Sequence, residues 1–92
     1  MNSTSGEEGT MRLDRLLVFL RFARTRSIAK AMILSGRMRL NSTRITKISC
    51  EVGVGDVLTL AYRGEICVAR IEKLPDRRLS PSEAERAWSR MA

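Results

Sequence analysis

The sequence contains no histidine and only two cysteines among its 92 residues. Histidine is the most common general acid and base in enzymes, and a structural zinc site usually needs four Cys or His ligands. Cys50 and Cys67 form no Cys-x-x-Cys pair, and the carboxylates lie singly in separate segments. We therefore expect no enzyme activity, no metal site and no cofactor. Cys67 falls in an apolar stretch, which predicts a small buried side chain and not half of a disulfide.

Long hydrophobic runs are absent as well. The longest, Leu16–Leu20, is far shorter than the ~20 apolar residues that span a bilayer. Met1–Thr10 has neither the basic region nor the apolar region of a signal peptide and is rich in Ser, Thr and Gly. We expect a cytoplasmic protein without a membrane partner, in which residues 1–10 form a disordered tail.

Aromatic residues make up only 4% of the chain. Proteins that hold single-stranded nucleic acid stack its bases on exposed rings, at ~1–3 kcal/mol per base, so a stacking platform is not expected here. Phe22 and Val18 fall on the side of the first predicted helix that lies opposite its leucine stripe. Either another part of the protein or a ligand must cover these two side chains.

Acidic residues are scarce in one region, residues 12–47, which we call the basic segment. It holds ten basic side chains, eight of them arginine, and one acid, Asp14. This local excess of nine charges is larger than the net charge of +7 for the whole chain. Such a concentration indicates a polyanionic partner, and the dominance of arginine favours phosphate, which a guanidinium binds through two parallel hydrogen bonds.

Two helices are predicted within the basic segment. The first begins near Leu13, with Thr10 as its cap, because apolar residues recur at the i, i+3, i+4, i+7 spacing: Leu13, Leu16, Leu17, Leu20 and Ala23. The hydroxyls of Thr25 and Ser27 can cap a second helix that ends at Gly36. Its predicted buried face consists of Ile28, Ala31, Met32 and Ser35.

A small, mostly antiparallel sheet is predicted after the helices. In Arg37–Leu40 the pattern alternates, so that both arginines point to one face and Met38 and Leu40 to the other. Asn41–Thr43 supplies a turn, and two apolar stretches, Val57–Tyr62 and Ile66–Leu74, form a hairpin.

A third helix is predicted near the end of the chain. Ser80 and Glu83 form a capping box with Pro81 at the first helical position. Its apolar face would consist of Ala84, Ala87, Trp88 and Met91. The fold class is therefore α+β: a helical hairpin packed on a small sheet, plus a C-terminal helix. We expect the binding domain to cover residues 11–74, and a linker and helix packed on it to cover residues 75–92.

The basic side chains themselves predict a binding surface. Seven cations lie at the corner between the two helices, on one strand face and in the loop after it, and we call this set the arginine ridge: Arg24, Arg26, Lys30, Arg37, Arg39, Arg44 and Lys47. Solvated surface charge is the alternative for each one singly. For the set together, without interleaved acids, binding of folded RNA through phosphates and groove shape is the stronger interpretation.

Four ordered segments resemble a known family. They read RLDRLL from Arg12, TRSIA from Thr25, GRMRLN from Gly36 and VGDVL from Val54. These segments are similar to the alpha-L RNA-binding motif, first named from small-subunit ribosomal protein four. A weaker similarity, RRLSPSEAE from Arg77, points to the ribosome-associated heat-shock protein fifteen family.

The resemblance implies RNA binding across the helical corner and the adjoining strand and loop. By position, the binding residues it implies are Arg12, Arg15, Arg26, Ser27, Lys30, Arg37, Arg39, Asn41 and Arg44. It further implies association with ribosomal RNA, in particular on the large subunit, in a translation-stress role. One departure concerns the turn: Ser42 stands where the family usually has glycine, and a left-handed residue there would cost about 1 kcal/mol.

Three other functions remain open at this stage. A helix-turn-helix that binds DNA is disfavoured, because a strand follows the short second helix directly. The ridge could instead dock an acidic protein, or the chain could be a guiding domain detached from an RNA-modifying enzyme. Nothing in the sequence resembles a dimer seam, so we expect a monomer.

Overall fold

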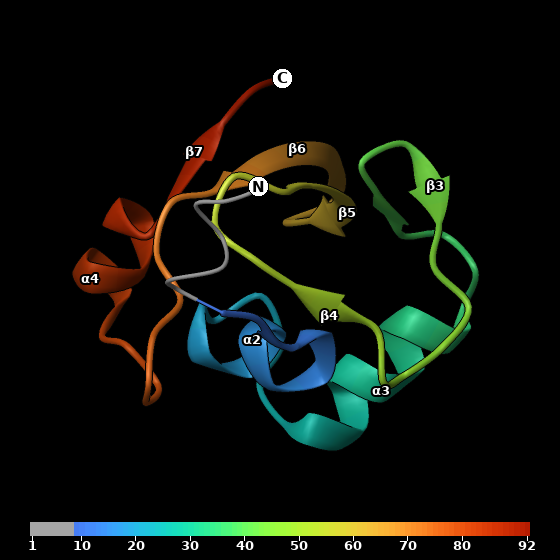
Figure 1. The fold of residues 1–92 in the computed structure, drawn as a ribbon, viewed down its shortest axis with the longest axis horizontal. Helices are drawn as coiled ribbons and strands as arrows, with labels where there is room; N and C mark the ends of the chain where they lie inside the picture. Colours follow the sequence, from blue (N-terminus) through green and yellow to red (C-terminus); the bar gives the residue numbers. More distant parts are fainter. Residues whose placement is uncertain (1–8) are drawn as a thin grey trace.

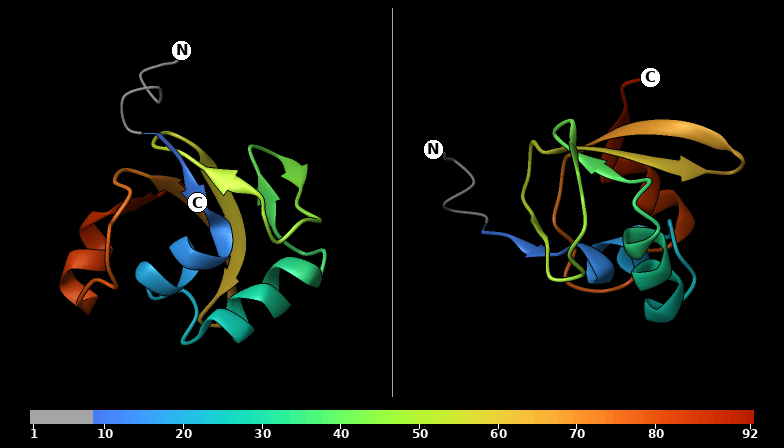
Figure 2. Two further views of the ribbon diagram at one scale, coloured as in Figure 1. Left: turned by 60° about the horizontal axis from the view of Figure 1, so that its bottom comes forward. Right: turned by 90° about the vertical axis from the view of Figure 1, so that its right-hand side faces the viewer.

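Two helices lie on one face of an antiparallel sheet in the computed structural model, which describes residues 9–92 (Figures 1 and 2). The elements, in chain order, are β1 (Met11–Arg12), α2 (Leu13–Phe19), α3 (Arg26–Leu34), β2 (Arg39–Leu40), β3 (Thr43–Arg44), β4 (Glu51–Val52), β5 (Val57–Tyr62), β6 (Glu65–Ile71), α4 (Pro81–Arg86) and β7 (Trp88–Arg90). The predicted α+β class is confirmed. Most of the predicted N-terminal tail, residues 1–8, lies outside the described residues.

The main sheet has five strands in the order β3-β2-β5-β6-β7, and each neighbouring pair is antiparallel. A separate two-stranded sheet joins β1 to β4, with Met11 opposite Val52. The strands β5 and β6 form the predicted hairpin and pair over its whole length, from Val57 opposite Arg70 to Tyr62 opposite Glu65.

Helix α2 buries its leucine stripe completely, as the spacing predicts, because Leu13, Leu16 and Leu17 face the core. The prediction of Thr10 as its cap is wrong. Arg12 occupies the N-cap position without a side-chain bond to the helix, and the Thr10 hydroxyl bonds to Glu51 of β4 instead. The helix also ends earlier than predicted, at Phe19, because Arg21 adopts a left-handed conformation (φ 66°) that reverses the chain.

Helix α3 begins where predicted but turns another face to the core. Thr25 caps it by accepting a hydrogen bond from the Ile28 N–H (3.1 Å). The fully buried residues are Ala29 and Ile33, whereas Ile28 and Ala31 are exposed. The predicted face was wrong because the pattern of this short helix fits two registers, and the small Ala29 side chain allows close packing against α2.

The hairpin between β2 and β3 is built around a left-handed turn. Asn41 and Ser42 both have positive φ values, 51° and 72°, in the two-residue loop between the paired residues Leu40 and Thr43. Left-handed residues at both positions match the right-handed twist of the flanking strands. The Asn41 amide stabilises the turn: its oxygen accepts from the Val57 N–H (2.9 Å), and its nitrogen donates to Asp56 (3.1 Å).

The C-terminal segment contains the predicted capping box, which both Ser80 and Glu83 complete. Hydrogen bonds from Arg77 and from the backbone of Ser80 lower the pKa of Glu83 to about 2. The predicted extent of this helix was wrong, because α4 ends at Arg86 and Trp88 begins strand β7. The free edge of β6 pairs with this segment, which satisfies backbone groups that a longer helix would leave exposed.

The two cysteines behave as the sequence indicates. Cys67 is fully buried in the core, Cys50 is half-buried, and both are free thiols. No helix among residues 9–92 is long and apolar enough to cross a membrane.

Candidate nucleic-acid interface

A buried carboxylate joins two of the predicted binding arginines. The Asp14 side chain is fully buried, and its two oxygens accept hydrogen bonds from Arg12 Nε (3.2 Å) and from Arg26 Nη2 (2.9 Å). It also accepts from the Arg15 N–H at 3.0 Å. Both guanidinium groups remain about half exposed (48% and 52%). Asp14 therefore holds two arginines from different elements, β1 and α3, side by side at the surface.

The pKa of Asp14 reflects this arrangement. Burial alone would raise its pKa, but the hydrogen bonds and charges of Arg26 and Arg12 together outweigh burial and lower it. The carboxylate is thus ionised at neutral pH and cancels one of the two positive charges. In the sequence, Asp14 stands out only as the single acid of the basic segment. Its isolation among ten cations was the signal that could have identified it as their organiser.

The first turn of α3 presents further groups that bind anions. Ser27 and Lys30 are exposed, and Lys30 follows Arg26 by one helical turn, on the same side of the helix. Backbone N–H groups at a helix start, together with the positive end of the helix dipole, attract phosphate. Arg24 is exposed in the connection just before this helix, and no ion pair involves it among the described residues.

Two arginines face each other across the β2–β3 hairpin. Arg39 and Arg44 are directly opposed in the antiparallel pair and both are exposed. Like charges in this position destabilise a sheet unless an anion lies between them. Arg39 also donates a long hydrogen bond to the Ser42 carbonyl (3.5 Å), and neither arginine forms an ion pair within residues 9–92.

The loop between β3 and β4 connects these two groups of cations. Its last residue, Cys50, accepts a hydrogen bond from the Leu13 N–H (2.8 Å) and donates one to the Lys47 carbonyl (3.1 Å). Lys47 therefore begins a hydrogen-bonded loop turn that ends at Cys50, and Cys50 in turn bonds to the first residue of α2. In Figure 1 the chain after β3 descends toward the helices before β4 begins. The loop that carries Lys47 thus connects the start of α2, which follows Arg12, to the β2–β3 hairpin, which carries Arg39 and Arg44.

Of the remaining predicted residues, Arg15 and Asn41 have side chains that already contact other parts of the protein. Arg15 lies over the ring of Phe19, with 5.1 Å between its guanidinium carbon and the ring centroid. Asn41 uses its amide in the turn described above. Arg37 is exposed between α3 and β2. Arg21, which lies in the basic segment but was not predicted to bind, donates to the Leu79 carbonyl (3.1 Å) and so fastens the C-terminal segment.

Two cations outside the basic segment have acidic partners. Arg77 pairs with Glu83 (2.9 Å), and Arg90 pairs with Glu65 (3.6 Å). Within the basic segment, Asp14 supplies the carboxylate in both ion pairs that the structure describes. The positive charge is therefore concentrated where the sequence puts it, and most of it has no internal counter-charge.

The aromatic residues do not form a platform on this surface. Phe22 packs against Tyr62 and Trp88, with ring centroids 4.9 and 5.1 Å away. Val18 is half-buried and packs against the same core. Other parts of the protein thus cover much of these two side chains, and the part of Phe22 that stays accessible lines a pocket beside α3.

Comparison with known proteins identifies the same region. The S4 domain family matches residues 11–58. The chain is 44% identical over 78 residues to the heat shock protein 15 homolog of Haemophilus influenzae. The aligned part makes up 85% of this chain and 59% of that relative. It is 32% identical over 66 residues to the RQC P-site tRNA stabilizing factor of Bacillus subtilis, covering 72% of this chain and 76% of that factor.

A solved structure agrees with these matches. The trimeric structure of Vibrio cholerae heat shock protein 15 superposes with a TM-score of 0.82 at 32% sequence identity, and the match covers 90% of this chain and 83% of that one. The resemblance seen in the sequence is confirmed, and the chain belongs to the S4 domain family, in which it is similar to heat shock protein 15.

Proposed function

We propose that this protein binds structured RNA without catalysis, through the arginine ridge together with Arg12, Arg15, Ser27 and Asn41. The observation that carries the proposal is that the cations of the basic segment are exposed and that Asp14, which is buried, is the single carboxylate paired with any of them in the described structure. Guanidinium groups held in fixed positions on rigid elements match the phosphate spacing of a folded RNA better than that of a flexible acidic peptide.

The partner we propose is ribosomal RNA on the large ribosomal subunit, which would place the protein in the cytoplasm. The name of one relative, a factor that stabilises P-site tRNA, supports a partner on the ribosome, and a second relative is named as a heat shock protein. We extend the proposal to a role in translation under stress. Because the chain spans 59% of the length of the Haemophilus influenzae relative, that relative has further residues that can add contacts of their own.

Salt dependence tests the electrostatic part of the proposal. If the ridge neutralises about six phosphates, affinity for an RNA hairpin falls by roughly 10³-fold between 50 and 200 mM salt, because counterions are released on binding. Filter binding or fluorescence anisotropy measures this slope. A flat response, or equal competition by duplex DNA, would contradict binding of structured RNA by the ridge.

Charge reversal tests the choice of surface. We expect the double variant Lys30→Glu, Arg39→Glu to lose RNA binding and to keep its fold, because neither residue bonds to Asp14. The double variant Arg70→Glu, Arg78→Glu is the matched control, since it changes the net charge equally at exposed positions outside the basic segment. Equal loss of affinity in both variants would mean that only net charge matters.

Sedimentation separates the remaining alternatives. We expect the protein to co-sediment with purified large ribosomal subunits at low salt and to dissociate at high salt or after nuclease treatment. Association that survives nuclease would indicate a protein partner.

We further propose a monomer in solution, although the Vibrio cholerae relative is described as trimeric, and analytical ultracentrifugation without RNA distinguishes the two states.

A further inference from the structure

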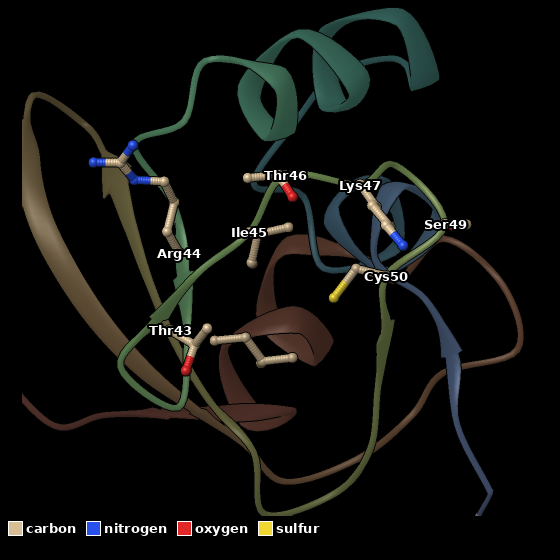
Figure 3. A pocket seen from close by; sticks show the side chains of 8 residues that line it. Thr43, Arg44, Ile45, Thr46, Lys47, Ser49 and Cys50 are labelled. Atoms are coloured by element: carbon tan, nitrogen blue, oxygen red, sulfur yellow. The ribbon is translucent and has the colours of Figure 1, made fainter.

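A pocket lies beside the arginine ridge, under the β2–β3 hairpin. Its volume is about 360 Å³, and it is lined by Leu40, Thr43, Arg44, Ile45, Thr46, Lys47, Ser49 and Cys50 (Figure 3). This volume is at the lower end of the range of small-ligand pockets, roughly 300–1,000 Å³, and suits one nucleotide.

Hydrogen bonds fix both ends of the β3–β4 loop that lines the pocket. At one end the Ile45 N–H donates to the Met38 carbonyl (2.9 Å), and the Ile45 side chain is almost fully buried. At the other end the Cys50 carbonyl accepts from the Leu13 N–H (2.8 Å). These bonds fix the two ends of the loop relative to the hairpin and to α2. A ligand would enter a pre-formed site and lose little binding energy to reorganisation.

The lining is apolar at its floor and polar at its rim. Leu40, Ile45 and Cys50 supply apolar surface, while the hydroxyl groups of Thr43, Thr46 and Ser49 can donate or accept hydrogen bonds. No acidic side chain lines the pocket. A flat ring that carries both donors and acceptors fits this combination, since bases are held between apolar side chains as well as between aromatic ones.

Cations stand on both sides of the pocket mouth. In Figure 3 the Lys47 side chain runs along the pocket toward Cys50, and the Arg44 guanidinium extends away from it, on the outer side of β3. Arg44 faces Arg39 there. Because β3 is the edge strand of the sheet, an RNA strand bound on the outer side can turn over this edge. Its phosphates would then lie between Arg44 and Lys47, with one base inside.

We propose that this pocket receives a single unpaired nucleotide, flipped out of the structured RNA that the ridge binds. The proposal rests on the proposed RNA binding and makes it more specific: the preferred RNA has a helical stem with a bulged or looped-out nucleotide. Such nucleotides are the usual targets of specific RNA recognition, because the grooves of paired RNA offer few base edges.

The test compares two RNA hairpins that share one stem, of which one carries a single bulged nucleotide. We expect the bulged hairpin to bind about tenfold tighter, which corresponds to ~1.4 kcal/mol, within the range for one inserted base. The variant Cys50→Leu adds volume inside the pocket. It should remove the preference for the bulge and leave binding of the paired hairpin unchanged, and Cys67→Ala is the control, because Cys67 lies in the core.

Alkylation of Cys50 gives a second readout on the unmodified protein. Burial and the charges of Asp56 and Glu51 raise the pKa of the Cys50 thiol, so N-ethylmaleimide should be used near pH 8.5. Bound bulged hairpin should slow the modification of Cys50 at least several-fold, and the paired hairpin should not. Cys67, fully buried, remains unmodified as long as the protein is folded, and mass spectrometry distinguishes the two sites.

The outcomes separate this proposal from the proposed function. If both hairpins bind equally and protect Cys50 equally or not at all, the pocket takes no nucleotide, and RNA binding by the ridge still stands. If polyglutamate protects Cys50 as well as the bulged hairpin does, the occupant is an acidic peptide and the proposal is wrong. If neither hairpin binds, both proposals fail.

Discussion

Asp14 shows how one residue can set the chemistry of a whole surface. A fully buried carboxylate is costly unless hydrogen bonds and opposite charges surround it, and here two arginines and a backbone N–H do so. In return, the carboxylate fixes two guanidinium groups that would otherwise sample many rotamers. We infer that Asp14 contributes to RNA affinity by positioning Arg12 and Arg26, without touching the RNA.

Replacement of Asp14 by asparagine tests this role. We expect Asp14→Asn to lower the free energy of unfolding by ~1.5–3 kcal/mol, the range for hydrogen bonds to charged groups. The lower end of this range is expected, because water can hydrate the half-exposed Arg12 and Arg26 once their partner is lost. Urea unfolding at neutral pH measures the change. RNA affinity should fall even though the variant gains net positive charge, and a rise in affinity would show that charge outweighs positioning. Asp76→Asn, at an exposed position, is the control.

The pH dependence of this variant has a definite sign. The pKa of Asp14 is lowered in the folded state, so its stabilising effect is fully present above the unfolded pKa of about 3.9 and is lost as the pH falls through the folded value. The difference in unfolding free energy between the native protein and Asp14→Asn should therefore shrink as the pH is lowered from 6 to below 3. A difference that does not change with pH would mean that the carboxylate's charge is irrelevant.

Ser42 is a second residue whose cost can be measured. It has a φ of 72°, a left-handed conformation that an L side chain adopts at a cost of about 1 kcal/mol and that glycine adopts freely. Ser42→Gly should therefore raise the free energy of unfolding by ~0.5–1 kcal/mol, as measured by urea unfolding. Thr43→Gly, in strand β3, is the matched control and should destabilise. An unchanged stability for Ser42→Gly would mean that the greater entropy of the unfolded chain cancels the relief of strain.

At the scale of elements, the β2–β3 hairpin combines two requirements that oppose each other. Arg39 and Arg44 repel across the strand pair, which costs stability in the free protein, and we propose that the same arrangement binds phosphate when RNA is bound. We expect Arg44→Thr to raise the free energy of unfolding by ~0.2–1 kcal/mol at low salt, because it removes the repulsion and places a β-branched residue in a strand.

The same variant should bind RNA less tightly. Loss of one phosphate contact should reduce the slope of log affinity against log salt by about one. Arg70→Thr on β6 is the control, since Arg70 lies opposite Val57 and Ser89 and no cation faces it. If Arg44→Thr lowers stability, or leaves the salt slope unchanged, Arg44 is a structural residue of the hairpin and not part of the binding surface.

The elements also show what could be predicted from the sequence. The leucine spacing of α2, the cap of α3 and the alternation of Met38 with Arg37 and Arg39 are local features, and each was predicted correctly. The buried face of α3 was predicted wrongly, because in a nine-residue helix the choice between Ile28 and Ala29 depends on the position of α2.

Long-range pairing explains the other errors. In the sequence, Trp88 fits a helical pattern with Ala84. In the fold it lies opposite Ile71 at the edge of β6, and pairing with that edge makes Trp88 a strand residue. For the candidate site, the sequence predicts which residues are charged but not which of them are in contact. Their charge is visible in the sequence, but the contact of Asp14 with Arg26 and the pocket under the hairpin depend on how the loops cross.

At the scale of the whole molecule, the C-terminal segment is fastened to the rest at three places. Strand β7 pairs with β6, Arg21 bonds to the Leu79 carbonyl, and the Leu79 N–H donates to the Phe19 carbonyl (3.0 Å). Trp88 also packs against Phe22 and Tyr62. These contacts lead us to propose that residues 75–92 unfold together with residues 11–74, in one cooperative transition.

Trp88, the only tryptophan, reports on this directly. In urea, its fluorescence and the far-UV circular dichroism should give the same midpoint, as expected for two-state unfolding of a small protein. Trp88→Ala should lower the free energy of unfolding by ~2–4 kcal/mol, somewhat less than for a fully buried ring, because Trp88 is only half-buried. Leu34→Ala, at an exposed helical position, is the control and should change little. A fluorescence midpoint at clearly lower urea would mean that the C-terminal segment detaches first, because its contacts are then weaker than those of the core formed by α2, α3 and β5.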